Sequence, residues 1–178
     1  MKRSEIPFMP EFFDRYINRV ADIELLDALS AFDRFEKIVP AETLTALGDS
    51  IYAPGKWTMK DIVQHLIDTE RIMSYRALRF ARNDQTILPG FDEDLFSTSA
   101  HATTRHLEDL LDEFAVVRQA SIALFNSFDE EMLLRTGICF NKSVSVAAIG
   151  FILAGHPIHH GHVIQERYLP LLSATGLI

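Results

Sequence analysis

The residues best suited to chemistry lie in one stretch, 155–168 (GHPIHHGHVIQERY), which holds four of the seven histidines of the chain. His156 and His160 are four residues apart, so on an α-helix their imidazoles lie one turn apart on the same face. Two imidazoles do not complete a transition-metal site, which needs at least one further protein ligand. His65 is the best third ligand, because it lies beside the apolar stripe of another expected helix. The sequence therefore predicts a metal site formed by His65, His156 and His160.

The histidine cluster also has a purely structural interpretation. Histidines on an apolar face often make only hydrogen bonds, and an HxxxH pattern by itself is weak evidence for a metal. His159 and His162 fall on other faces of the same helix and are poorer candidates for the same ion. Because Glu166 follows His162 by four residues, a solvated His–Glu pair is the simpler interpretation of His162. His162 is nevertheless kept as an alternative ligand.

Length and composition favour one globular domain that contains a substantial core. The chain has 178 residues, of which 48% are hydrophobic and 24% charged, as is ordinary for a soluble protein. Its net charge of -8 argues against a nucleic-acid-binding protein, which would carry a basic stripe. No apolar run reaches the ~20 residues that a membrane helix needs. One cysteine, Cys139, and an N-terminus without a secretory apolar segment predict a cytoplasmic location.

Hydrophobic periodicity of about 3.6 residues predicts an all-α protein built as an antiparallel four-helix bundle. No segment shows the alternation of a β-strand. Metal sites in such bundles are formed by inward side chains on facing helices, which is the arrangement proposed for the histidines. A long loop is expected at 83–104, between the second and third helices, and loops of that length are commonly lids or binding loops. The expected long helices are 23–38, 57–82, 105–128 and 145–169, and the expected short ones are 10–19, 40–47 and 129–135.

Pro157 bears directly on the geometry of the histidine pair. Proline lacks the N–H of a helix hydrogen bond and disfavours helical conformation at the residue before it, here His156. The last helix is therefore expected to kink or restart at this point, and a kink could turn His156 inward. The same helix is expected to end before Pro170.

Three segments, PGKWTMKDIVQHLIDTERIMSYRALRFARND, PGFDEDLF and GHPIHHGHVIQERYL, together resemble the DinB-like (YfiT-related) four-helix bundle proteins. The likeness extends from about Pro10 to Leu169. In that family the motif is one histidine on the second helix and an HxxxH on the last, which correspond here to His65, His156 and His160. The resemblance implies a single DinB-like domain over residues 1–178. It also implies a divalent metal held by three histidines, with water in the open positions.

A site of three imidazoles suits two reaction classes. Neutral ligands leave the +2 charge of the metal on its remaining ligands, so a bound water ionises near pH 7 and a bound thiol is deprotonated. The site would serve a hydrolase or a small-thiol S-transferase acting on a small-molecule substrate, and the DinB-like family contains suspected members of both types. Imidazoles suit zinc, nickel, iron and copper alike. The alternative is a non-catalytic bundle that is stabilised by metal or hydrogen bonds and recognises a partner.

Charged side chains near the expected site supply candidates for further roles. Hydrolysis needs a base near the water, and Asp68, three residues after His65, is the candidate catalytic base or a partner that orients His65. Asp92 and Asp94 of the long loop could close over the metal, Asp92 as a substrate-binding residue. Arg76 lies about three turns beyond His65 on the same face. It could bind an anionic substrate or pair with an acid on a neighbouring helix.

Two further expectations concern contacts between helices and between chains. Glu70 lies nearly opposite His65 on its helix, so we expect it in a surface or inter-helix ion pair. The 13 phenylalanines are compatible with a homodimer, although the sequence does not identify an exposed patch.

Overall fold

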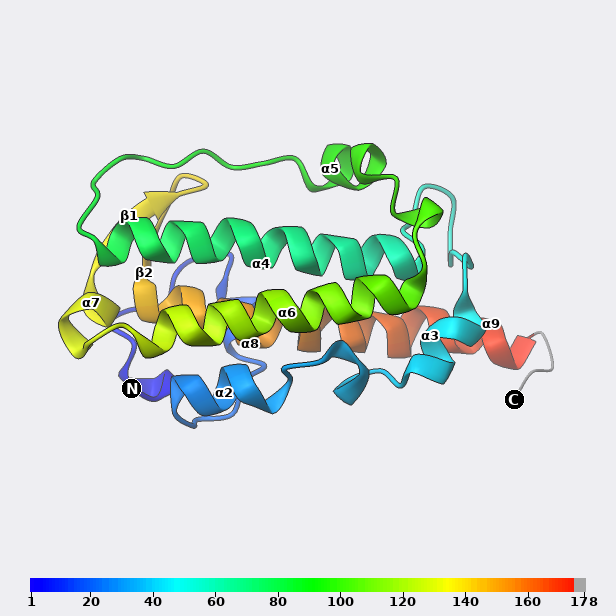
Figure 1. The fold of residues 1–178 in the computed structure, drawn as a ribbon, viewed down its shortest axis with the longest axis horizontal. Coiled ribbons are helices and arrows are strands. Elements are labelled where there is room, and N and C mark those ends of the chain that lie inside the picture. The colour runs from blue at the N-terminus through cyan, green and yellow to red at the C-terminus, as the bar shows by residue number, and fades with distance from the viewer. Residues whose placement is uncertain (175–178) are drawn as a thin grey trace.

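The computed structural model describes residues 1–174 and is an antiparallel four-helix bundle with one short β-hairpin (Figure 1). Its long helices are α4 (Met59–Ala81), α6 (Leu107–Asn126) and α8 (Val146–Val163), and α4 packs against both others. A π-helical turn, Ile164–Tyr168, continues α8 into α9 (Leu169–Ala174). None of the described helices is long and apolar enough to cross a membrane. The shorter elements are α1 (Asp14–Ile17), α2 (Leu25–Ala31), α3 (Ala41–Leu47), α5 (Glu93–Ala100), α7 (Glu130–Leu134) and the 3-10 turns Arg3–Glu5, Phe35–Lys37 and Ala102–Thr104.

The helices α4 and α8 begin where polar side chains bond their free N–H groups. At α4 the Thr58 hydroxyl accepts from the backbone N–H of Asp61 at 3.3 Å, and the Asp61 carboxylate accepts from the N–H of Thr58 at 2.9 Å. At α8 the Ser145 hydroxyl accepts from the N–H of Ala148 at 3.1 Å. These caps place the starts of α4 and α8 within two residues of the starts expected at 57 and 145.

The prediction of one long helix at 23–38 is wrong. α2 ends at Ala31, and Phe32 leaves the helical region with φ -125° and ψ 56°. The guanidinium of Arg118 donates to the carbonyls of Leu29 at 3.2 Å and Phe32 at 3.5 Å. Because a side chain from α6 satisfies these carbonyls, the helix can end there without leaving them unpaired. The N-terminal part of the bundle therefore consists of short helices and 3-10 turns instead of one long helix.

The structure contains a β-hairpin, although no segment of the sequence shows the alternation of a β-strand. β1 (Thr136–Cys139) pairs antiparallel with β2 (Lys142–Ser145) through the two-residue connection Phe140–Asn141. Both connecting residues have positive φ, 52° and 57°, as a type I′ turn requires. Strands of four residues are too short for alternation to identify them.

The segment predicted as a long loop, 83–104, contains α5 and is attached to the hairpin. The N–H of Leu88 donates to the carbonyl of Ile138 at 2.9 Å, beside the edge of β1. Figure 1 shows this segment running alongside α4, back along its length, before it forms α5. The connection is therefore long, as predicted, but it carries a helix of its own.

The last helix does not restart at Pro157. α8 runs continuously from Val146 to Val163, although Pro157 cannot donate to the carbonyl of Leu153. Nη2 of Arg118 donates to that carbonyl instead, at 2.8 Å. The expected end before Pro170 is also wrong, because α9 includes Pro170. The π-helical turn before it changes the hydrogen-bond pattern that a proline would otherwise interrupt.

Two apolar clusters fill the interior, and a polar layer lies between them. One cluster contains the apolar residues of α4 up to Ile67 and, on the last helical run, Ile164 and the residues after it. The other contains the apolar residues of α4 from Met73 and those of α8 up to Ala154. At the centre of the layer Arg118 is fully buried and forms a two-pronged ion pair with Glu70, at 2.7 and 2.8 Å. The expected inter-helix ion pair of Glu70 is therefore confirmed. The buried polar residues of the layer are Thr69, Glu70, Arg118, Ser121 and His156.

Replacing Glu70→Ala should lower the free energy of unfolding by about 3–5 kcal/mol, because it leaves the charge of Arg118 buried without a partner. Urea unfolding followed by circular dichroism measures this loss. The matched control is Arg34→Ala, which breaks an exposed ion pair with Asp112 and should cost less than about 1 kcal/mol. Equal losses in the two variants would contradict a central role for the buried pair.

Candidate metal centre

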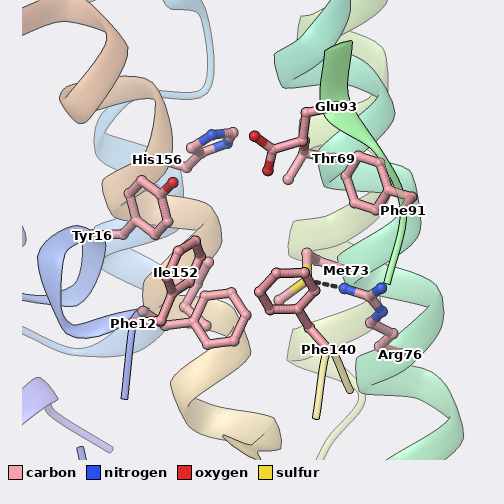
Figure 2. Close-up of a pocket in the computed structure, with 11 residues that line it drawn as sticks. Phe12, Tyr16, Thr69, Met73, Arg76, Phe91, Glu93, Phe140, Ile152 and His156 are labelled. Atoms are coloured by element: carbon pink, nitrogen blue, oxygen red, sulfur yellow. Dashed lines mark hydrogen bonds between the residues drawn. The ribbon is translucent and has the colours of Figure 1, made fainter. Parts of the chain in front are cut away.

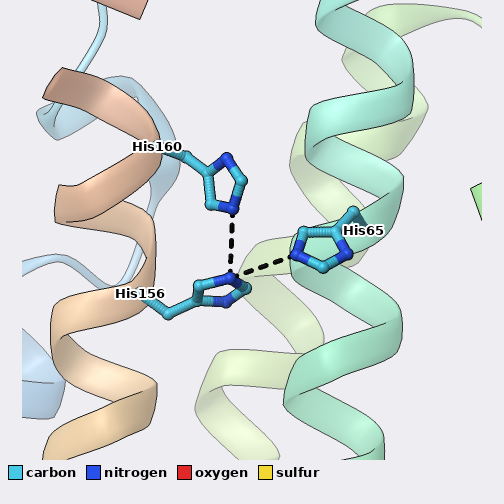
Figure 3. Close-up of side chains that lie close together, drawn as sticks. All are labelled: His65, His156 and His160. Carbon is cyan, nitrogen blue, oxygen red and sulfur yellow. Dashed lines mark hydrogen bonds between the residues drawn. The ribbon is translucent and has the colours of Figure 1, made fainter. Parts of the chain in front are cut away.

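The structure brings together the three histidines predicted as metal ligands (Figure 3). Nε2 of His156 lies 3.1 Å from Nε2 of His65 and 3.1 Å from Nε2 of His160. The three ligand atoms all lie within 4.8 Å of one another. His65 comes from α4, whereas His156 and His160 are one turn apart on α8. The continuous path of α8 through Pro157 preserves that spacing.

Hydrogen bonding among the three imidazoles does not satisfy all three Nε2 atoms. Each imidazole nitrogen has either one N–H or one in-plane lone pair. Nε2 of His156 therefore cannot form a good hydrogen bond with His65 and His160 at the same time. One cation between three lone pairs satisfies every nitrogen together. Three neutral nitrogens with an open position are also the donor set of a catalytic zinc site, so these residues fit a divalent metal.

Burial keeps the three imidazoles in their metal-binding, neutral form. His65 and His156 are 6% and 4% exposed, and His160 is half-buried. Desolvation, together with the nearby His159, lowers the pKa of His65 to about 4. Desolvation and the neighbouring imidazoles hold the pKa values of His156 and His160 well below their usual range. Protons therefore do not compete with a metal at neutral pH.

Trp57 packs against the ligands from the start of α4. Its ring centroid lies 4.7 Å from that of His65 and 6.3 Å, in a stacked arrangement, from that of His160. The backbone carbonyl of Trp57 accepts a hydrogen bond from the hydroxyl of Tyr168 at 2.6 Å. Because Tyr168 follows the ligand pair in the same helical run, this bond ties the indole segment to the helix that carries the ligands.

Tyr16 packs against the site from α1. Its ring meets the edge of His156 at a centroid distance of 5.0 Å. α1 can come this close because residue 155 is a glycine: a Cβ on Gly155 would lie 2.0 Å from the carbonyl oxygen of Tyr16. Sequence analysis did not single out Tyr16 or Trp57, since neither contact follows from spacing within one helix.

His159 and His162 lie outside the group of converging nitrogens. Nδ1 of His162 contacts the guanidinium of Arg19, so its hydrogen-bond partner is Arg19 rather than the expected Glu166. His159 packs edge-on against Tyr16 at 5.2 Å. Burial, with the charge of Arg19 adding to it, lowers the pKa of His159 to about 4. Neither histidine belongs to the metal-ligand group formed by the described residues.

Asp68 and Asp92 do not line the pockets that reach His156 and His160. The carboxylate of Asp68 accepts from Nε2 of Gln64 at 2.9 Å, and Gln64 accepts in turn from Arg105 at 2.9 Å. Asp92 caps α5 by accepting from the N–H of Leu95 at 2.9 Å. The catalytic role of Asp68 and the substrate-binding role of Asp92 stay predictions.

Glu93 is the carboxylate that sequence reasoning missed. It lines both the pocket that contains His156 and the pocket that contains His160, and Asp94 lines the second. Figure 2 shows its carboxylate directed toward His156, on the opposite side of the pocket from Tyr16. Desolvation raises its pKa above the usual value. Recognising α5 with Asp92 as its cap would have left Glu93 and Asp94 as the acids that the backbone does not use.

Comparison with known proteins agrees with the geometry. Residues 25–164 match the family model of the DinB superfamily. The chain belongs to the DinB superfamily. A relative from Oceanobacillus iheyensis, named "Putative metal-dependent hydrolase", is 26% identical over 125 residues, which are 67% of this chain and 71% of the relative.

A solved structure of the same fold is that of YfiT from Bacillus subtilis, described as "a probable metal-dependent hydrolase with an unusual four-helix bundle topology". The TM-score is 0.63 at 17% sequence identity, over 95% of this chain and 90% of YfiT. The likeness to DinB-like bundles that three sequence segments indicated is therefore confirmed.

Zinc should bind with a stoichiometry of one per chain, and His160→Ala should weaken its binding by at least about 100-fold, because one of three nitrogen donors is lost. Competition titration against a chromogenic chelator measures both quantities. His162→Ala is the matched control on the same helix and should keep wild-type affinity. A similar loss in both variants would contradict the assignment of ligands.

Acidification of chelator-treated protein should lower its free energy of unfolding between pH 6.5 and about 4. In this range the unfolded chain protonates imidazoles that the folded chain keeps neutral, so stability rises with pH. Urea unfolding at several pH values measures the slope. His65→Gln should reduce the loss by up to about 3 kcal/mol, whereas His106→Gln, at an exposed position, should not. Parallel slopes for the wild type and His65→Gln would contradict the buried, neutral state of His65.

Proposed function

We propose that this DinB-superfamily protein is a metal-dependent hydrolase of a small-molecule substrate, with His65, His156 and His160 holding one divalent ion. The observation that carries the proposal is the convergence of three Nε2 atoms within 4.8 Å of one another, beside pockets lined by Glu93. The names of the Oceanobacillus relative and of YfiT support a hydrolase in particular.

A divalent ion at this position supplies a Lewis acid and a water that ionises near neutral pH. Glu93 accepts a proton from the attacking water and returns it to the leaving group. Its raised pKa suits this exchange, since a base works best when its pKa approaches the working pH. The hydroxyl of Tyr16, whose pKa is raised mainly by burial, remains protonated and donates a hydrogen bond to the developing oxyanion.

The pockets beside the ligands support catalysis over a purely stabilising metal. A metal that only stabilises a fold has a closed ligand shell, whereas a catalytic one keeps a position open toward substrate. Three nitrogens from two helices leave the side toward Glu93 free of further ligands in the described structure. Thiol S-transfer would use the same open position and stays a prediction, as does the choice among zinc, nickel and iron.

Zinc-loaded protein should hydrolyse at least one member of a panel of small esters and amides, and Glu93→Gln should lower kcat by about 10²–10⁴-fold without changing zinc stoichiometry. His160→Ala should abolish turnover. The control Glu108→Gln changes an exposed acid on α6 and should leave kcat unchanged.

Asp68→Asn decides between the two candidate bases, because it should retain activity if Glu93 has that role. A loss confined to Asp68→Asn would overturn the assignment of Glu93. Equal rates for the wild type and His160→Ala across the whole panel would overturn the hydrolase proposal. Turnover of a thiol–electrophile pair alone would favour the transferase.

A further inference from the structure

Arg76 is a buried cation in the pocket that reaches His156 (Figure 2). It is 4% exposed. Nη2 donates to the carbonyl of Pro89 at 2.7 Å, and Nη1 contacts Sδ of Met73 at 3.1 Å. Within residues 1–174 no carboxylate forms an ion pair with it, so the acid expected from a neighbouring helix is not found there. Its positive charge lacks a counter-ion from the described chain.

The other buried arginine, Arg118, does have a paired carboxylate. Arg118 is balanced by Glu70 at 2.7 Å in the polar layer. A buried guanidinium without a paired anion is costly. Burial lowers the pKa of Arg76 from its ordinary value, but a guanidinium stays charged in proteins. Arg76 is therefore a cation placed where a ligand can supply the anion.

Aromatic rings form the walls of the pocket next to Arg76. The guanidinium carbon lies 5.9 Å from the ring centroid of Phe91, and the rings of Phe12 and Phe140 are 5.4 Å apart. Phe12 has a left-handed backbone, with φ of 73°, which bulky residues rarely adopt. Strained residues of this kind concentrate at binding sites. The walls fit a flat or branched apolar body.

Thr69 supplies an unpaired polar atom at the other end of the same pocket. Its Oγ1 is buried without a hydrogen-bond partner among the described residues. It lies one helical turn after His65, and Arg76 follows seven residues later, a rise of about 10 Å along α4. One face of α4 therefore carries a metal ligand, a free hydroxyl and an unpaired guanidinium in fixed order. This order sets where the reacting group and the anion of a ligand must lie.

We propose that the pocket binds a small carboxylic acid, with its carboxylate on Arg76, its apolar body between Phe12, Phe91 and Phe140, and its scissile group at the end formed by His156 and Thr69. A single guanidinium matches a carboxylate in a two-pronged pair, whereas a phosphate dianion would retain an unpaired charge. Only the position of the scissile group rests on the proposed hydrolase function. Carboxylate binding depends on Arg76 and the pocket alone.

Calorimetric titration of the chelator-treated full chain with 3-phenylpropionate and its neutral amide, 3-phenylpropanamide, tests the proposal. Chelation removes any ion that would itself bind the carboxylate. The wild type should bind the carboxylate at least about tenfold more tightly than the amide, as a charge-assisted pair would. Arg76→Gln should make the two affinities equal. Arg79→Gln is the matched control and should keep the ratio, because Arg79 pairs with Asp84 and does not line the pocket.

Equal affinities in the wild type would overturn the proposal, and so would a ratio that survives Arg76→Gln. Arg76→Lys keeps the charge and should retain part of the ratio even if the glutamine variant does not fold. The wild-type comparison needs no variant at all. A tenfold ratio in a protein that hydrolyses nothing would support the carboxylate site and count against the hydrolase. Hydrolysis combined with equal affinities would support the hydrolase and count against the carboxylate site.

Discussion

The guanidinium of Arg118 joins the parts of the bundle that must be in register for the histidines to meet. It pairs with Glu70 of α4, bonds the last carbonyls of α2 and donates to the carbonyl of Leu153 on α8. The last bond replaces the one that Pro157 cannot make. α8 therefore stays helical across the two ligands that it carries, and α4 is held beside it at the level of His65. A charge buried for this purpose is stable only because Glu70 neutralises it.

The same polar layer explains why the site is electrically neutral before a metal arrives. Its one strong cation is balanced by an adjacent carboxylate, and the three imidazoles have lost water without gaining a carboxylate partner. Their pKa values fall, so the three imidazoles stay neutral and each can offer one nitrogen lone pair to a common ion. A divalent ion supplies the positive charge that this arrangement lacks. Glu93 stands outside the group of ligands, where it can exchange protons instead of closing the coordination shell.

Helix periodicity and helix-start signals within one segment predicted the features that depend on that segment alone. The spacing of His156 and His160 follows from helix periodicity, and α4 and α8 begin within two residues of the starts expected at 57 and 145. α2 ends because of Arg118, which is 86 residues away from Phe32 in the chain, and no periodicity within 23–38 could reveal that bond. The single domain, the homodimer, the cytoplasmic location and the absence of nucleic-acid partners stay predictions from composition.

Two features of the site could not be predicted from the sequence: the position of Glu93 and the missing ion-pair partner of Arg76 among the described residues. The acidic run at the start of α5 has three carboxylates, of which Asp92 is used by the backbone. Which of the other two faces the histidines depends on how α5 packs over α4. Arg76 was placed on the correct face by spacing, but its lack of a partner is a property of all the helices around it. Both features depend on how distant segments pack over α4, which a single helix does not encode.

X-ray absorption spectroscopy at the metal edge of the purified protein tests the three-histidine site most directly, because it reports ligand type, number and distance together. We expect one ion per chain with three nitrogen ligands at about 2.0–2.1 Å and a remaining oxygen ligand from solvent. A coordination shell without imidazole nitrogens, or one unchanged by His65→Ala, would contradict this expectation.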